Sequence, residues 1–192
     1  GSQSVTITIT ENESAPTVTL SSSANSITEN TGSSLTLTAT LSVATTADVT
    51  VGISTSGTGT EGTDYGTISD ITISAGATTG TASFTPTDDS TYEGNETAVV
   101  SISSVSGADA AESGTQSVTI TITENESAPT VTLSSSANSI AENAGSSLTL
   151  TATLSNPTTA DVTVGISTSG TGTEGTDYST ISDITISAGA TT

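Results

Sequence analysis

Carboxylates are almost the only side chains in this sequence that could do chemistry, and several of them are crowded together. The segment 88–96, here called the acidic segment, reads Asp-Asp-Ser-Thr-Tyr-Glu-Gly-Asn-Glu and holds four carboxylates in nine residues. Like charges this close destabilise a folded chain unless a cation offsets them. Hard divalent ions such as Ca2+ prefer oxygen ligands. Asp88, Asp89, Glu93 and Glu96 are therefore interpreted as calcium ligands, with a solvated turn as the alternative.

Other acidic residues stand in expected loops elsewhere along the chain. Glu29 lies in Thr-Glu-Asn-Thr-Gly, Asp64 lies in Gly-Thr-Asp-Tyr, and Glu124 and Glu126 enclose an asparagine. If the fold brings these loops to one end of a domain, their oxygens complete a cage with the acidic segment. Asp64 has an equally good structural interpretation, in which it caps backbone amides while Tyr65 enters the core.

The composition excludes most other functions. The sequence contains Lys+Arg 0, His 0, Cys 0 and Asp+Glu 20, which gives a formal net charge of -20. General acid–base and nucleophilic catalysis usually recruit His, Lys or Cys. A glycosidase needs only two carboxylates, but the aromatic residues that build sugar platforms make up 2%. We therefore expect no enzyme.

The same composition bears on the partners and the location of the protein. A surface without Lys or Arg repels nucleic acid, and no apolar run approaches the roughly 20 residues of a membrane span. We expect neither nucleic-acid binding nor membrane insertion. The missing Lys and Arg also remove every trypsin-type cleavage site, which suits an extracellular or cell-surface location.

A long internal repeat sets the domain organisation. The run Gln-Ser-Val-Thr-Ile-Thr-Ile-Thr begins at residue 3 and again at residue 116, and the junction Glu-Asn-Glu-Ser-Ala-Pro begins at residues 11 and 124. A spacing of 113 residues between these copies is that of a whole domain. We divide the chain into the last strand of a preceding repeat (1–14), a complete domain (15–126) and the first part of a following repeat (127–192).

Alternation of Ile, Val and Leu with Thr and Ser predicts strands in the complete domain. The expected strands are residues 17–20, 34–41, 47–54, 71–74, 81–85, 97–103 and 117–123. No apolar pattern has helical spacing over ten residues. An all-β fold of tandem antiparallel β-sandwiches follows.

An ordered set of motifs in this repeat resembles the Calx-beta domain, a family first described in sodium/calcium exchangers and common in large bacterial surface proteins. The motifs are Glu29-Asn-Thr-Gly, Ala47-Asp-Val-Thr-Val51, Gly62-Thr-Asp-Tyr65, the strand and turn 71–76, the acidic segment and Val118-Thr-Ile-Thr-Ile122. The resemblance implies a seven-stranded, immunoglobulin-like β-sandwich whose loops bind Ca2+ at one end. It nominates Glu29, Asp64, Asp88, Asp89, Glu93 and Glu96 as ligands. Binding members carry a run of Asp after the last strand, where this chain has Thr123-Glu-Asn-Glu126.

These features predict a structural or adhesive extracellular protein, a stalk or spacer that Ca2+ rigidifies at the domain ends. Its partners would be neighbouring copies of the same repeat. The alternative is a self-assembling filament subunit with head-to-tail or strand-exchange contacts. A calcium sensor, a third class, predicts a large conformational change on binding.

Overall fold

The computed structural model describes residues 1–10, 12–143 and 145–192. Contacts divide the chain into two compact units, each described by itself below. The first comprises Gly1–Ile27, Gly32–Pro86 and Thr97–Thr121, and the second comprises Thr28–Thr31, Thr87–Glu96 and Ile122–Thr192. Among the described residues, no helix has the length and apolar character to cross a membrane.

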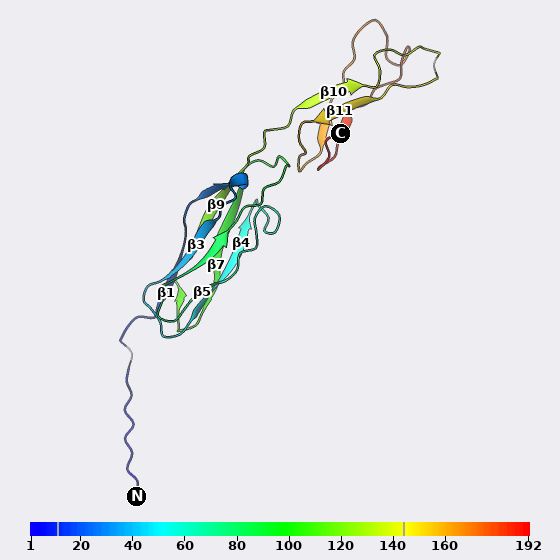
Figure 1. The fold of residues 1–192 in the computed structure, drawn as a ribbon. Coiled ribbons are helices and arrows are strands. Elements are labelled where there is room, and N and C mark those ends of the chain that lie inside the picture. Colours follow the sequence, from blue (N-terminus) through cyan, green and yellow to red (C-terminus); the bar gives the residue numbers. More distant parts are fainter. Residues whose placement is uncertain (11, 144) are drawn as a thin grey trace. The chain divides into compact units, whose positions relative to one another are not determined.

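The strands of the complete repeat pair into two sheets, which can be followed in Figure 1. In chain order they are β1 (Thr17–Ser22), β2 (Ser26–Thr28), β3 (Leu35–Leu41), β4 (Val49–Gly57), β5 (Ile71–Ile73), β6 (Thr79–Phe84), β7 (Glu96–Ser106), β8 (Ala111–Glu112) and β9 (Ser117–Thr123). Within the described residues, one sheet has the order β6-β3-β1-β8 and the other the order β2-β9-β7-β4-β5. The all-β, immunoglobulin-like sandwich predicted from the sequence is confirmed.

Period-two alternation decides which side chains enter the core. Val18 faces Leu41 and Leu20 faces Ala39 across the antiparallel β1–β3 pair, and all four are buried. Thr19, between Val18 and Leu20, is exposed because successive side chains of a strand point to opposite faces. Each buried Val, Leu or Ile contributes about 1.5–3 kcal/mol relative to an exposed one.

Aromatic residues add to this core. Tyr65 and Phe84, which are 1% and 0% exposed, stack with ring centroids 4.9 Å apart. A core position for Tyr65 was one of the two interpretations that the sequence offered. Tyr92 is only half-buried. It lies in the acidic segment between β6 and β7, and its N–H donates to Pro157 O at 2.9 Å.

All seven predicted strands are present, β9 with the predicted ends and the other six with shifted ends, and two short strands had not been predicted. β2 has three residues and β8 has two, too few for a period to be recognised. β8 runs parallel to β1 and pairs Ala111 with Thr17. The 3-10 helix η1 (Glu29–Thr31) follows β2 directly and had not been predicted either.

The following copy repeats part of this plan. Its strands are β10 (Val131–Ser135), β11 (Leu150–Leu154), β12 (Val162–Val164) and β13 (Ile184–Ile186). Val131 pairs with Leu154 as Val18 pairs with Leu41. Ala152, Leu154 and Ile186 form a small buried cluster. Val131 and Leu133, however, are 43% and 53% exposed, although their counterparts Val18 and Leu20 are buried.

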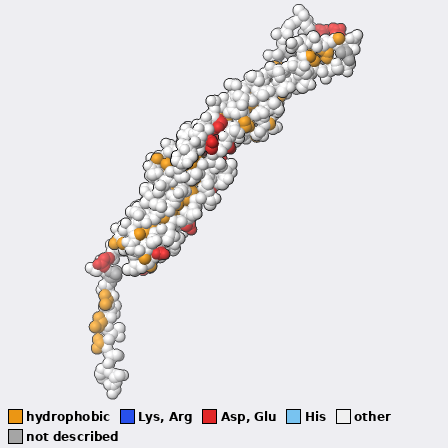
Figure 2. All heavy atoms as spheres, viewed as in Figure 1, with side chains coloured by type: hydrophobic (Ala, Val, Ile, Leu, Met, Phe, Trp, Pro, Cys, Tyr) orange, Lys and Arg blue, Asp and Glu red, His pale blue; other side chains and the backbone are white. Residues whose placement is uncertain are grey.

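Residues 1–10 lie in no strand, although their sequence predicts one. Val5, Ile7 and Ile9 are 86%, 81% and 92% exposed. Figure 2 shows hydrophobic side chains at the surface of this N-terminal part of the chain. A strand needs a neighbour to pair with. The assignment of residues 1–14 to a preceding repeat therefore stays a prediction.

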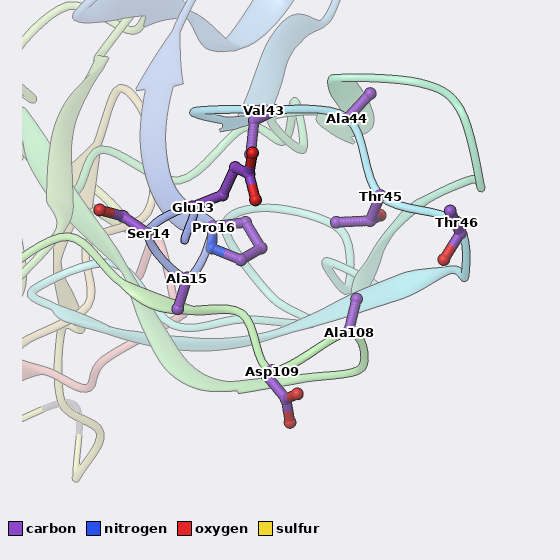
Figure 3. Close-up of a pocket in the computed structure, with 10 residues that line it drawn as sticks. All are labelled: Glu13, Ser14, Ala15, Pro16, Val43, Ala44, Thr45, Thr46, Ala108 and Asp109. Carbon is purple, nitrogen blue, oxygen red and sulfur yellow. The ribbon is translucent and has the colours of Figure 1, made fainter. Parts of the chain in front are cut away.

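A hollow of about 530 Å³ in the first unit is lined by residues 13–16, 43–46 and 108–109. Glu13 and Asp109 are its acidic groups, and Figure 3 shows their carboxylates pointing in different directions. The hollow therefore does not supply converging oxygen ligands.

Candidate metal centre

Two loops that follow neighbouring strands place three carboxylates together. β2 and β9 are adjacent in the larger sheet. Glu29 begins η1 directly after β2, whereas Glu124 and Glu126 follow the end of β9. Each of the three offers one carboxylate oxygen, and these oxygens lie within 4.8 Å of one another. The distance is short enough for one cation to contact all three.

Main-chain N–H groups hold the Glu124 carboxylate in place. Its Oε2 accepts hydrogen bonds from the N–H groups of Glu93 and Gly94 at 2.6 and 2.8 Å. Its Oε1 accepts hydrogen bonds from the N–H groups of Asn125 and Glu126, both at 3.0 Å. Burial by itself raises the pKa of Glu124, but the hydrogen bonds from Glu93, Glu126 and Gly94 outweigh it and lower the pKa to about 2. Glu124 is therefore a fixed negative charge.

Glu29 has the opposite character. Its side chain is 6% exposed. Burial, followed by repulsion from Glu124, Glu126, Glu93 and Asp89, raises the pKa of Glu29 to about 7. At neutral pH the Glu29 carboxyl group is therefore only partly ionised. It must lose its proton before it can bind a cation as a carboxylate.

Glu126 and Asn125 supply oxygens that lack partners. Within the described residues, Oε2 of Glu126 and Oδ1 of Asn125 are buried and accept no hydrogen bond. Asn125 Nδ2 donates to Glu126 Oε1 at 3.0 Å and to Asp88 Oδ1 at 3.3 Å. Interaction with Glu124 raises the pKa of Glu126, and burial and the charge of Asp88 add to the rise. Buried oxygens without donors suit Ca2+, which takes carboxylate and amide oxygens as ligands.

The acidic segment contributes negative charge around this group. Asp88 and Asp89 are exposed, and Asp89 Oδ1 accepts a hydrogen bond from the Thr91 N–H at 2.6 Å. Glu93 and Glu96 offer oxygens within 4.8 Å of each other. Asp88 and Asp89 are thus surface charges, whereas Glu93 and Glu96 are half-buried.

Asp64 belongs to the first unit and is 8% exposed. Its Oδ2 accepts a hydrogen bond from the Thr60 N–H at 2.5 Å, and its own N–H donates to Thr60 O at 2.9 Å. Asp64 thus caps a backbone amide, and Tyr65 is buried. This arrangement agrees with the structural interpretation predicted for the pair from the sequence. Its predicted role as a metal ligand stays a prediction.

The sequence did not predict the main-chain part of this centre. The N–H groups of Glu93 and Gly94 hold Glu124, and Asn95 Oδ1 accepts a hydrogen bond from the Glu124 N–H at 3.0 Å. Gly94 has a φ of 81°, a left-handed conformation that glycine adopts without strain. This conformation lets the loop turn back onto Glu124. Glu-Gly-Asn between two strands was the available signal for such a turn.

The fold and the centre define an immunoglobulin-like β-sandwich with a cluster of carboxylate oxygens in the loops that follow β2 and β9. The sequence model of the Calx-beta domain matches residues 11–126 and 124–190. The chain belongs to the Calx-beta family.

Solved structures that resemble this chain include two from Calx. The first, CBD12 from CALX1.2, has a TM-score of 0.45 and 18% identity, with 52% of this chain and 41% of that chain covered. The apo form of Calx CBD1 has a TM-score of 0.46 and 18% identity, with 57% of this chain and 98% of that chain covered. A two-domain protein of unknown function from Bacteroides fragilis has a TM-score of 0.40 and 10% identity, with 79% and 68% covered. The chain thus spans less than half of the first of these, and no curated protein matches it.

Proposed function

We propose that this chain is a non-catalytic, structural or adhesive segment of an extracellular or cell-surface protein, a stalk or spacer in which Ca2+ stiffens a row of tandem repeats. The observation that carries the proposal is the convergence of Glu29, Glu124 and Glu126 within 4.8 Å. Glu124 and Glu126 belong to the junction sequence that leads from one repeat into the next. A cation bound there fixes the junction as well as the loops.

Glu124 explains how one ion could stiffen a junction. It holds the N–H groups of Glu93 and Gly94 on one oxygen and those of Asn125 and Glu126 on the other. The same side chain therefore joins the loop before β7 to the residues that leave β9. An ion on Glu124 and Glu126 would restrict backbone rotation at residues 124–126, and such restriction suits a stalk or spacer.

Removing Ca2+ from the chain tests this proposal. We expect a chelator to lower the melting temperature and to broaden the distribution of dimensions in small-angle X-ray scattering. Replacing both junction acids, Glu124→Gln with Glu126→Gln, should abolish the response to Ca2+. Asp109→Asn, on an exposed turn, is the matched charge control and should respond as the parent does. Identical melting and scattering with and without Ca2+ would rule the proposal out.

A filament subunit is the second candidate, favoured by the exposed apolar side chains of residues 5–9. Electron microscopy of native material separates the two candidates. Thin, separate strings support a stalk, whereas regular fibres support a polymer of this chain.

A further inference from the structure

The turn of residues 91–94, here called the Tyr92 turn, contacts a loop of the following copy. The Tyr92 N–H donates to Pro157 O at 2.9 Å, and Tyr92 forms an isolated parallel β-bridge with Thr158. Both segments belong to the second unit. Two consecutive repeats are therefore in contact through main-chain groups, at a place that lies outside the regular strands of either copy.

The loop that receives this turn is residues 155–158, here called the docking loop. Asn156 and Pro157 stand in it where the complete repeat has Val43 and Ala44. Over the whole length on which the two copies can be compared, only five positions differ. Two of these five are neighbours in the docking loop. The copies thus differ at the residues that meet the Tyr92 turn.

Asn156 ties the docking loop to the junction between the repeats. Its Nδ2 donates to Ser127 O at 2.8 Å, and its Oδ1 accepts a hydrogen bond from Ser155 Oγ at 2.7 Å. In the complete repeat the corresponding Val43 and Ser14 both line the hollow shown in Figure 3. The valine side chain has no N–H to donate. Asn156 therefore makes a hydrogen bond to the junction that Val43 cannot make.

Pro157 and Glu124 fix the two sides of the contact before they meet. A proline ring fixes its own φ and keeps the residue before it extended, which here is Asn156. On the other side, Glu124 Oε2 holds the N–H groups of Glu93 and Gly94, next to Tyr92. Because both sides are already ordered, their association loses little conformational entropy.

We propose that Asn156 and Pro157 form a docking site for the Tyr92 turn of the preceding repeat and lock the junction between the two repeats without Ca2+. The groups that meet are a main-chain N–H and a carbonyl, and the anchor is a neutral amide, so no cation is needed. A repeat with Val43 and Ala44 at these positions holds its neighbour less firmly. This lock goes beyond the proposed role of Ca2+ and does not depend on it.

Amide hydrogen exchange in chelator, followed by NMR, tests the contact. Asn156→Val with Pro157→Ala, the loop variant, gives the docking loop the residues of the complete repeat. We expect the Tyr92 amide to exchange faster in this variant by roughly twofold to tenfold, the change that the loss of one net hydrogen bond produces. Val43→Asn with Ala44→Pro is the reciprocal change and the matched control, and it should leave the exchange of Tyr92 unchanged.

The rest of the amide spectrum shows whether each variant is folded, because both use residues that the other copy already has at those positions. Equal exchange of the Tyr92 amide in the parent and in a folded loop variant would overturn the proposal. Faster exchange in the control as well would also overturn it, because the effect would then not come from the docking loop.

A distance measurement separates this lock from the proposed role of Ca2+. The chain has Cys 0, so Thr81→Cys and Thr163→Cys, both at exposed positions, take one spin label each. In chelator we expect a broader distance distribution for the loop variant than for the parent. Failure of the Ca2+ proposal, seen as a parent that does not respond to Ca2+, leaves this difference in place. A loop variant as narrow as the parent in chelator would refute the lock, whatever Ca2+ does.

Discussion

Replacing Glu29 by Gln should make the metal-free protein more stable at neutral pH, although it removes a carboxylate from the centre. Burial and four neighbouring carboxylates raise the pKa of Glu29 from 4.5 to about 7. The amide of Gln has nearly the shape of the protonated acid and carries no charge. Glu29→Gln therefore fixes the neutral state that the metal-free site prefers.

The magnitude follows from the two pKa values. Between pH 4.5 and about 7 the folded chain holds a proton on Glu29 that the unfolded chain has lost. Stability consequently falls as pH rises through this window and levels off above it. The difference of about 2.5 in pKa corresponds to at most about 3.5 kcal/mol, because each tenfold change in an equilibrium is about 1.4 kcal/mol. For the complete domain that is a melting shift of at most roughly 15 °C.

Urea unfolding in chelator at pH 4.5, 6 and 8 measures the effect. We expect the parent and Glu29→Gln to agree at pH 4.5 and to diverge as pH rises, with the Gln variant more stable at pH 8. Adding Ca2+ should reverse the order, since a ligand that binds only the folded state stabilises it. Glu142→Gln, at the equivalent position of the following copy, is the matched control. Equal stability of parent and Glu29→Gln at pH 8 in chelator would refute the assigned environment of Glu29.

Three further outcomes are expected. Calcium binding should release about one proton at pH 6 and fewer at pH 8. The reason is that Glu29, with a pKa of about 7, must lose its proton to become a ligand. Calorimetry in buffers of different ionisation enthalpy measures the number of protons released. Gly80→Val should destabilise the sandwich by about 1–3 kcal/mol, because a Cβ there meets Thr72 O at 2.4 Å. Gly66→Ser, the residue of the following copy at an open position, is its control and should be nearly neutral. Phe84→Ala should cost about 3–5 kcal/mol in urea unfolding, since Phe84 is fully buried, and a smaller loss would place Phe84 outside the core.

The alternation of apolar and polar residues predicted the longer strands. It did not predict which occurrence of a repeated strand sequence is buried. The alternation in residues 117–123 predicted β9, and the structure has β9 at those residues. The same alternation in residues 3–10 predicted a strand where the structure has an exposed segment. The difference lies in the neighbours that each segment finds, and a pattern read from one segment carries no information about them.

The sequence predicted only part of the candidate metal centre, because the rest depends on which segments become neighbours in the fold. Acidic residue type and loop position nominated Glu29, Glu124 and Glu126 as ligands. The contrast between Glu29 and Glu124 could not be predicted, because it arises from burial after β2 and from N–H groups donated by Glu93 and Gly94. These depend on the adjacency of β2 and β9 and on the turn before β7, both of which are tertiary features.

Composition and site geometry together restrict what can relieve the repulsion around Glu29. A protein with Lys or Arg could place an ammonium or guanidinium group beside three converging carboxylates, but this chain has Lys+Arg 0 and His 0. Only a proton or a cation from solution can then neutralise the group. The proton is lost as pH passes about 7, the range in which a hard divalent cation meets the least competition from protons. A sequence without basic side chains thus makes the stability of this end of the sandwich depend on its ionic surroundings.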